Sequence, residues 1–176
     1  MRRSVVWVLG VAAVLAGMAA WAPADLRAAQ AKSGPRSIDA CGVLTSEELG
    51  AIVKRKVQPR KVPASQPASL GVSVCMYATA DGLHTISVTT YGLEAISRTQ
   101  SKTLQAYYDA MKTSNAQAAR KPPIVIPGAG RHGSLFVNPR GAGDVLLVLR
   151  TDCVVVSSLN GFTRDEAMAT GKAIGT

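Results

Sequence analysis

The sequence predicts an α+β fold: a single domain in which about three helices pack on one antiparallel sheet, in the order α-β-β-α-β-β-β-α. Two capping boxes, at Thr45 and Thr163, mark helix starts. Strand-like segments follow one another through short turns, most clearly at Asp81-Gly82, a dipeptide typical of hairpins. No regular alternation of strands and crossover helices is present, which argues against a parallel sheet.

The first helix is predicted over residues 45–53. Thr45 is the expected N-cap, and Glu48 occupies the third helical position, as a capping box requires. Leu44 and Leu49 fall at the two positions of a hydrophobic staple, which fixes the angle at which the chain enters a helix. Four local signals therefore agree on this helix start.

A hairpin and one long helix are predicted next. Residues 72–78 and 83–91 alternate or are β-branched, as half-buried strands are. A helix is expected over about 93–113, because apolar residues recur there at helical spacing. This stripe, which is more typical of a core than of a ligand box, contains Leu93, Ile96, Leu104, Tyr107, Tyr108 and Met111.

The last third of the chain is predicted to hold short strands and a final helix. Strands are expected at 124–126 and 134–138, on either side of a glycine loop. The strands at 145–150 and 153–159 are apolar almost throughout, so they are expected to be central and covered by a helix. The second capping box opens a helix that ends near residue 174.

The residues 128–133 match the pattern G-x-G-x-x-G. A dinucleotide site needs a helix directly after this motif, but the residues SLFVNP predict a strand. We interpret the motif as a glycine-rich connection and predict no cofactor. The two histidines, His84 and His132, belong to no recognisable catalytic or metal-ligand pattern, so neither catalytic nor metal-binding residues are predicted.

The N-terminus predicts an export signal, residues 1–31. Arg2 and Arg3 precede an apolar run over 5–22, and Ala29-Gln30-Ala31 provides a cleavage site before Lys32. The run is also long enough to span a membrane, so a cleaved signal and an uncleaved anchor both remain open. In either case the domain is expected to be exported, to the periplasm or the exterior.

Met18 stands where a lipoprotein would carry its lipidated cysteine, after Leu15-Ala16-Gly17. The anchor requires a thiol, so we predict no lipid. A flexible leader is expected at 32–38, followed by the α+β domain at 39–176.

The chain is basic, with 20 Lys and Arg residues against 11 Asp and Glu residues and a formal net charge of +9. A proline-spaced segment, residues 54–71, is its most positive part. Its candidate partner contacts are Lys54, Arg55, Lys56, Arg60 and Lys61. This segment is either a contact surface for an acidic partner or a solvated loop that aids solubility. No aromatic stacking pattern accompanies it, so nucleic acid is not expected.

The three cysteines are Cys41, Cys75 and Cys153. In an oxidising compartment two of them are expected to pair, and all three pairings remain open. A Cys41–Cys75 bond would bridge the proline-spaced segment and dock the first helix on the sheet. Cys153 begins an apolar strand beside Asp152, whose carboxylate raises the pKa of a thiol and disfavours a nucleophile.

Four features occur together: the motif Asp39-x-Cys41-x-x-Leu44-Thr45-x-x-Glu48, a strand with Cys75-x-Tyr77, a Pro127-Gly128-x-Gly130 turn and a short final helix. In these features the chain resembles a class of small exported bacterial domains of unknown function. Many members of this class are lipoproteins. The resemblance covers about residues 39–160 and implies a Cys41–Cys75 disulfide and a compact α+β sandwich. It implies no catalytic residues. The present chain departs from the lipoprotein members at Met18 and adds Cys153.

The sequence therefore favours a non-enzymatic exported domain that binds an acidic envelope component or protein through the basic segment. Membrane contact is expected only if the signal segment stays uncleaved, and the oligomeric state is left open. The alternative is a small-molecule or lipid-binding module, with an apolar pocket between the long helix and the sheet lined by Tyr107, Tyr108 and Met111. An enzyme is the least favoured reading, because no acid, base and nucleophile are placed together.

Overall fold

A seven-stranded antiparallel sheet is the centre of the structure, a computed structural model that describes residues 38–60, 71–139 and 143–176. The elements are α2 (Ala40–Val43), α3 (Ser46–Val53), β1 (Val57–Arg60), β2 (Val72–Thr79), β3 (Thr85–Gly92), α4 (Leu93–Ser97), α5 (Leu104–Ala119), β4 (Ile124–Val125), β5 (His132–Phe136), β6 (Asp144–Leu149), β7 (Cys153–Asn160) and α6 (Arg164–Gly175). The predicted α+β class is confirmed. The expected signal peptide, Met18 and the leader up to residue 37 lie outside the described residues.

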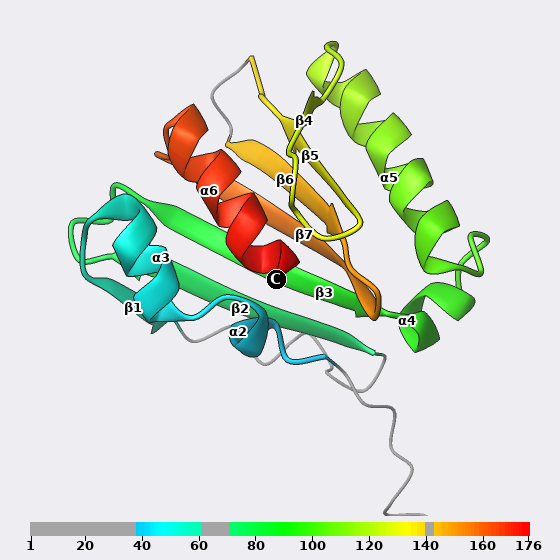
Figure 1. The fold of residues 1–176 in the computed structure, drawn as a ribbon, viewed down its shortest axis with the longest axis horizontal. Coiled ribbons are helices and arrows are strands. Elements are labelled where there is room, and N and C mark those ends of the chain that lie inside the picture. The colour runs from blue at the N-terminus through cyan, green and yellow to red at the C-terminus, as the bar shows by residue number, and fades with distance from the viewer. Residues whose placement is uncertain (1–37, 61–70, 140–142) are drawn as a thin grey trace, which may run out of the picture. The chain divides into compact units, whose positions relative to one another are not determined.

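The sheet consists of two meanders that meet in the middle. Its strand order is β1-β2-β3-β7-β6-β5-β4, and every neighbouring pair is antiparallel. The first meander holds β1 to β3, the second holds β4 to β7, and the register from Thr85↔Asn160 to Gly92↔Cys153 joins them. Helices α4 and α5 carry the chain from the centre of the sheet to its far edge (Figure 1).

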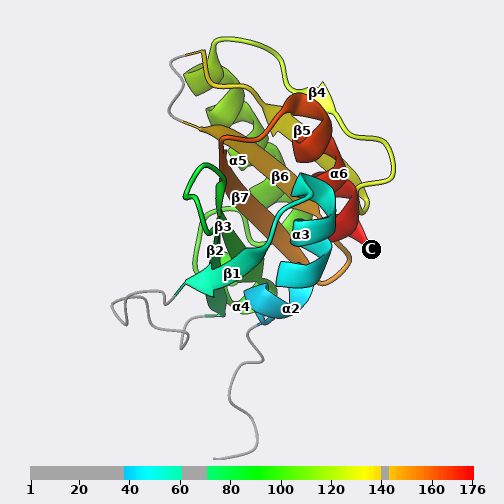
Figure 2. The ribbon, with the colours of Figure 1, turned by 90° about the vertical axis from the view of Figure 1, so that its left-hand side faces the viewer.

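Helices cover both faces of this sheet. Figure 2 shows α3 and α6 on one side and α5 on the other. The central strands therefore bury both sets of alternating side chains, because successive residues of a strand point to opposite faces. In β7, Cys153 and Val155 belong to the core cluster beneath α3 and α6, whereas Val154 belongs to the cluster beneath α5. The prediction that 145–150 and 153–159 are central strands covered by a helix is confirmed, and the structure covers them on both faces.

The prediction of one long helix over 93–113 is wrong. The chain forms α4, breaks, and starts again as α5, with Lys102 in the left-handed region (φ 58°). The Thr103 hydroxyl then caps α5 by accepting a hydrogen bond from Ala106 N at 3.1 Å. Serine and threonine favour caps over helix interiors, which explains the break. Leu93, placed in the buried stripe, is 55% exposed.

Two further elements, α2 and β1, were not predicted. With them, with the long helix split in two, and with four strands instead of three before the last helix, the order becomes α-α-β-β-β-α-α-β-β-β-β-α. Helix α2 is a single short turn, whose start is capped by Asp39 Oδ1 accepting from Cys41 N at 3.0 Å. Strand β1, which contains Pro59, lies inside the proline-spaced segment, for which no strand was predicted. Both elements depend on contacts with the rest of the fold.

Strand β1 tolerates its proline because it is an edge strand. Thr79 N donates to His84 O across the β2–β3 turn, so Tyr77, two residues earlier, also directs its backbone toward β3. Pro59 is paired with Tyr77 and therefore directs its nitrogen away from β2, toward the free edge. A proline at that position breaks no ladder bond and leaves one N–H fewer at the edge.

Both predicted capping boxes are present. Thr45 and Thr163 each accept from the backbone N–H of the glutamate three residues later, and each glutamate side chain accepts from the threonine backbone. Leu44 and Leu49, the predicted staple, are both buried in the same core cluster. In the part of the chain that the structure describes, no helix has the length and apolar character needed to cross a membrane.

Candidate functional site

The N-terminal segment of the domain is fixed to one face of β2 by three side chains. Ser73, Cys75 and Tyr77 alternate along the strand and so point to the same face. The Ser73 hydroxyl accepts from the first backbone N–H of α2 at 3.1 Å, Cys75 forms a disulfide with Cys41, and the Tyr77 hydroxyl donates to Leu44 O. The disulfide implied by the resemblance is therefore confirmed, and the Cys-x-Tyr motif acts as a double anchor.

Cys153 is a free and buried thiol. Burial, and then the nearby Asp152 carboxylate, raise its pKa to about 12. A thiol with such a pKa carries almost no thiolate at neutral pH, and the thiolate is the nucleophilic form. Cys153 therefore acts as a small core residue.

The basic segment contains two kinds of cation, which differ in whether they form an ion pair. Lys54, Lys56 and Arg60 are exposed and form no ion pair with another described residue. We call these three residues the β1-edge cations. Arg55 is different, because its guanidinium pairs with Asp81 in the β2–β3 turn. The fifth predicted contact, Lys61, lies outside the described residues.

Asp81 is held in its charged form by several donors. The Thr79 hydroxyl, the Leu83 backbone N–H and the Arg55 guanidinium all donate to its carboxylate. The hydrogen bond from Thr79 is the largest cause, followed by the Leu83 bond, and together with Arg55 they lower the pKa of Asp81 to about 2. Arg55 is thus neutralised over the whole physiological pH range and contributes little to an anion-binding surface.

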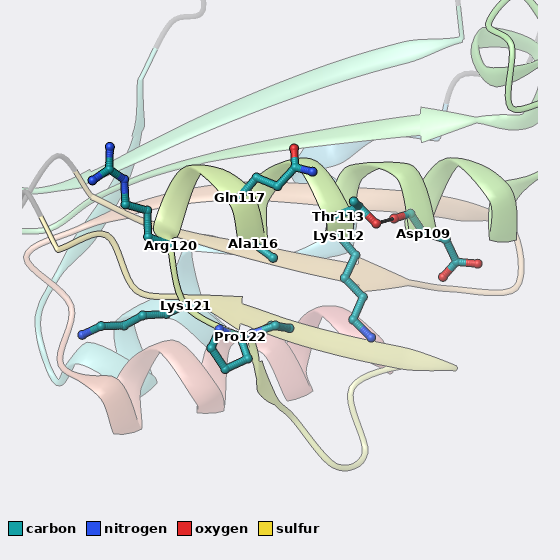
Figure 3. A pocket seen from close by; sticks show the side chains of 9 residues that line it. Asp109, Lys112, Thr113, Ala116, Gln117, Arg120, Lys121 and Pro122 are labelled. Carbon is teal, nitrogen blue, oxygen red and sulfur yellow. Dashed lines mark hydrogen bonds between the residues drawn. The ribbon is translucent and has the colours of Figure 1, made fainter.

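An open groove lies beside the C-terminal half of α5 and has a volume of about 660 Å³. It is lined by Asp109, Lys112, Thr113, Ala116, Gln117, Arg120, Lys121, Pro122 and Pro123. Figure 3 shows that Lys112, Arg120 and Lys121 extend in different directions, with Lys112 leaving α5 on the side away from Gln117. Because its cationic groups do not converge, the groove alone does not define a site for one small ligand.

A smaller hollow shares Lys112 with this groove. It has a volume of about 220 Å³, and we call it the glycine-loop hollow. Its lining residues are Tyr108 and Lys112 of α5 and residues 125–134. The Tyr108 hydroxyl and Ser134 Oγ lie 2.8 Å apart in a buried hydrogen bond, and the His132 ring stacks against Tyr108 with 5.8 Å between ring centroids. Burial raises the pKa of Tyr108, so its hydroxyl is protonated at neutral pH.

The glycine motif has a packing role in this structure. Strand β5, not a helix, follows it, as the sequence predicted. Gly130 has φ 57°, and a Cβ there would lie 2.6 Å from Leu149 O. Gly175 of α6 faces the same loop, since its Cβ would lie 2.1 Å from Gly130 N. Close approach of the loop to β6 and α6 thus accounts for these glycines.

The two histidines lie in different environments. His84 stacks edge-on against Phe162 with centroids 5.5 Å apart, and its Nε2 is 3.9 Å from Glu166 Oε2. His132 lies at the glycine-loop hollow. Among residues 38–60, 71–139 and 143–176, no hydrogen bond joins either histidine to a serine or cysteine, and no cluster of three His, Cys, Asp or Glu residues could hold a metal ion.

The apolar stripe of α5 belongs to the core. Tyr107, Tyr108 and Met111 pack in the cluster that joins α5 to the sheet, together with Ile96 and Leu147. Their packing favours the core interpretation of this stripe. The pairing of Tyr108 with Ser134 was not predicted, because the two residues are 26 positions apart and share no local motif.

No protein-family model, curated protein or solved structure matches this chain. The resemblance to small exported bacterial domains therefore stays an expectation based on sequence motifs. The function has to be argued from the surface chemistry of the chain itself.

Proposed function

We propose that this protein is a non-enzymatic exported domain that binds an acidic component of the cell envelope through the β1-edge cations. The observation that carries the proposal is the contrast within the basic segment. Lys54, Lys56 and Arg60 are exposed and unpaired with described residues, whereas Arg55 is neutralised by Asp81.

Uncompensated cations on one edge create a positive local potential, which attracts polyanions and speeds their association. The net charge of the chain, +9, acts in the same direction. The β1-edge cations are solvent-exposed, so salt would screen the attraction. At about 0.15 M salt the screening length is about 8 Å, and at 1 M it falls to about 3 Å. Binding through this surface should therefore weaken strongly as salt is added.

The non-enzymatic part of the proposal is supported by the state of the reactive groups. The one free cysteine of the described chain has a thiol whose pKa is raised to about 12. Nucleophilic catalysis requires a base that activates the nucleophile through a hydrogen bond, and neither histidine occupies such a position among the described residues.

The export part of the proposal depends on the signal peptide, residues 1–31. N-terminal sequencing of the protein recovered outside the cytoplasm should begin at Lys32. A product that starts at Met1 and sediments with membranes would instead show an uncleaved anchor.

The binding surface can be tested with two variants of equal charge. Protein expressed from the full-length sequence is mixed with its own envelope fraction and sedimented. Lys56→Glu/Arg60→Glu should reduce the bound fraction about tenfold or more, because two attractive contacts become repulsive. Arg164→Glu/Lys172→Glu makes the same charge change on exposed residues of α6 and should bind almost normally.

Equal loss in both variants would show that bulk charge alone matters, and unchanged binding in the first variant would remove the β1 edge as the contact. Arg55→Gln/Asp81→Asn provides a further check within the same segment. It should leave binding unchanged, since it removes both charges of an ion pair that carries no net charge.

A further inference from the structure

The buried hydroxyl pair in the glycine-loop hollow has one donor without a partner. Tyr108 and Ser134 are 2% and 1% exposed, and their hydrogen bond uses the proton of only one of the two hydroxyls. The other O–H meets no acceptor among the described residues. A buried donor without a partner is costly, so the hollow favours an occupant that supplies an acceptor oxygen.

Positive charge converges on the same hollow. Lys112 of α5 and Arg131, the residue before β5, both line the hollow, and neither forms an ion pair with another described residue. Gly128 and Gly130 also line the hollow; the Gly128 backbone N–H makes no hydrogen bond within the described chain, whereas the Gly130 nitrogen lies beside Gly175 of α6. The His132 ring completes this side. Residues that carry hydroxyl, ammonium and guanidinium groups thus line one space.

We propose that the glycine-loop hollow binds the phosphoryl group of a small phosphate ester, with Lys112 and Arg131 as its charged contacts. A phosphoryl group is the fitting ligand because it offers several acceptor oxygens and negative charge, and charge-assisted hydrogen bonds are the strong ones. Exposed loop amides are a common way to hold such oxygens.

The size of the hollow suits more than a bare phosphate ion. A volume of about 220 Å³ is roughly seven times the share of one water molecule in the liquid. The space therefore holds the phosphoryl group and a short polar substituent. The same chemistry is available from a soluble phosphate ester and from the glycerophosphate headgroup of a lipid.

This site is independent of the β1 edge. Strands β1 and β4 are the two edges of the sheet, six strand spacings apart, or about 29 Å. The Lys112 and Arg131 variants therefore leave the β1-edge cations unchanged. Failure of one proposal does not decide the other.

The test follows the backbone amide signals of Gly128 and Gly130 by NMR during titration with inorganic phosphate and with glycerol 3-phosphate. In the unmodified protein these signals should shift and saturate. Lys112→Gln/Arg131→Gln should weaken binding about tenfold or more, because it removes two charged contacts. Arg120→Gln/Lys121→Gln removes two cations that line only the neighbouring groove, so it should bind like the unmodified protein.

Tyr108→Phe provides a second and uncharged variant, since it deletes one hydroxyl and keeps the ring. It should also weaken binding, and its unfolding curve shows whether the fold is intact. Sedimentation with lipid vesicles distinguishes a lipid headgroup from a soluble phosphate ester. A lipid headgroup is identified if the protein sediments with phosphatidylglycerol vesicles but not with phosphatidylcholine vesicles, and if Lys112→Gln/Arg131→Gln abolishes this sedimentation. The proposal would be overturned if the amide signals responded to neither inorganic phosphate nor glycerol 3-phosphate, or if both charge variants weakened binding equally.

Discussion

Removal of the Cys41–Cys75 disulfide is the sharpest test of how the domain is held together. In the variant Cys41→Ser/Cys75→Ala, serine replaces the exposed cysteine and alanine the buried one, which is 2% exposed. The Ser73 and Tyr77 anchors on the same face of β2 remain. The native fold should therefore form, with lower stability.

The expected loss follows from the length of the closed loop. The two cysteines are 34 positions apart. In the chain-entropy model, opening a loop of this length frees the unfolded chain and costs about 3.8 kcal/mol. A domain of this size has a total stability of about 5–15 kcal/mol, so the variant should keep about 1–11 kcal/mol of it. Its Tm should fall by about 10–20 °C.

Urea denaturation followed by circular dichroism provides the measurement. The free energy of unfolding should fall by about 3–4 kcal/mol, and the m-value should rise, because the unfolded chain without a cross-link exposes more surface. The matched control is Cys153→Ala, which removes a buried sulfur without opening a loop and should cost only about 1 kcal/mol. Equal losses in the two variants, with no change in the m-value, would refute the argument from loop closure.

Three further predictions concern single side chains. Tyr77→Phe should lower the free energy of unfolding by about 1–3 kcal/mol in urea, because the Leu44 carbonyl oxygen loses its buried donor; full stability would contradict the anchor. Cys153, with its pKa raised to about 12, should resist iodoacetamide at pH 8 in the folded protein and react once urea unfolds it, as mass spectrometry would detect. Asp81 has a pKa of about 2 in the fold, below the 3.8 of an unperturbed aspartate, so it adds stability above about pH 4 that is lost as the pH falls toward 2. Thermal melts of Asp81→Asn should therefore show a smaller acid-dependent loss than the unmodified protein; the same pH slope would refute this.

The elements that could be predicted are those whose cause is local. The helices at Thr45 and Thr163 carry their own capping boxes, so their starts were found to the residue. Strands β6 and β7 are apolar on both alternating faces, which indicates central strands whatever the topology.

The elements that were missed depend on distant partners or on a break in a pattern. Strand β1 exists because β2 offers it an edge, and its proline makes the local sequence look like a loop. The stripe at 93–113 keeps its spacing across the break at Lys102, so periodicity alone joined α4 to α5. The glycine-loop hollow requires α5 to pack across β5, which brings Tyr108 to Ser134 and cannot be seen in either segment alone.

The two edges of the sheet limit how any partner can be recognised. At β1, Pro59 leaves the free edge without one main-chain donor, and exposed cations flank it. At the other edge, β4 pairs over only two residues of β5. Proteins that bind extended peptides by strand addition need a continuous row of free backbone groups, and neither described edge provides one. The binding proposed above would therefore depend on side-chain charge and shape, which would make it sensitive to salt and tolerant of the backbone conformation of the partner.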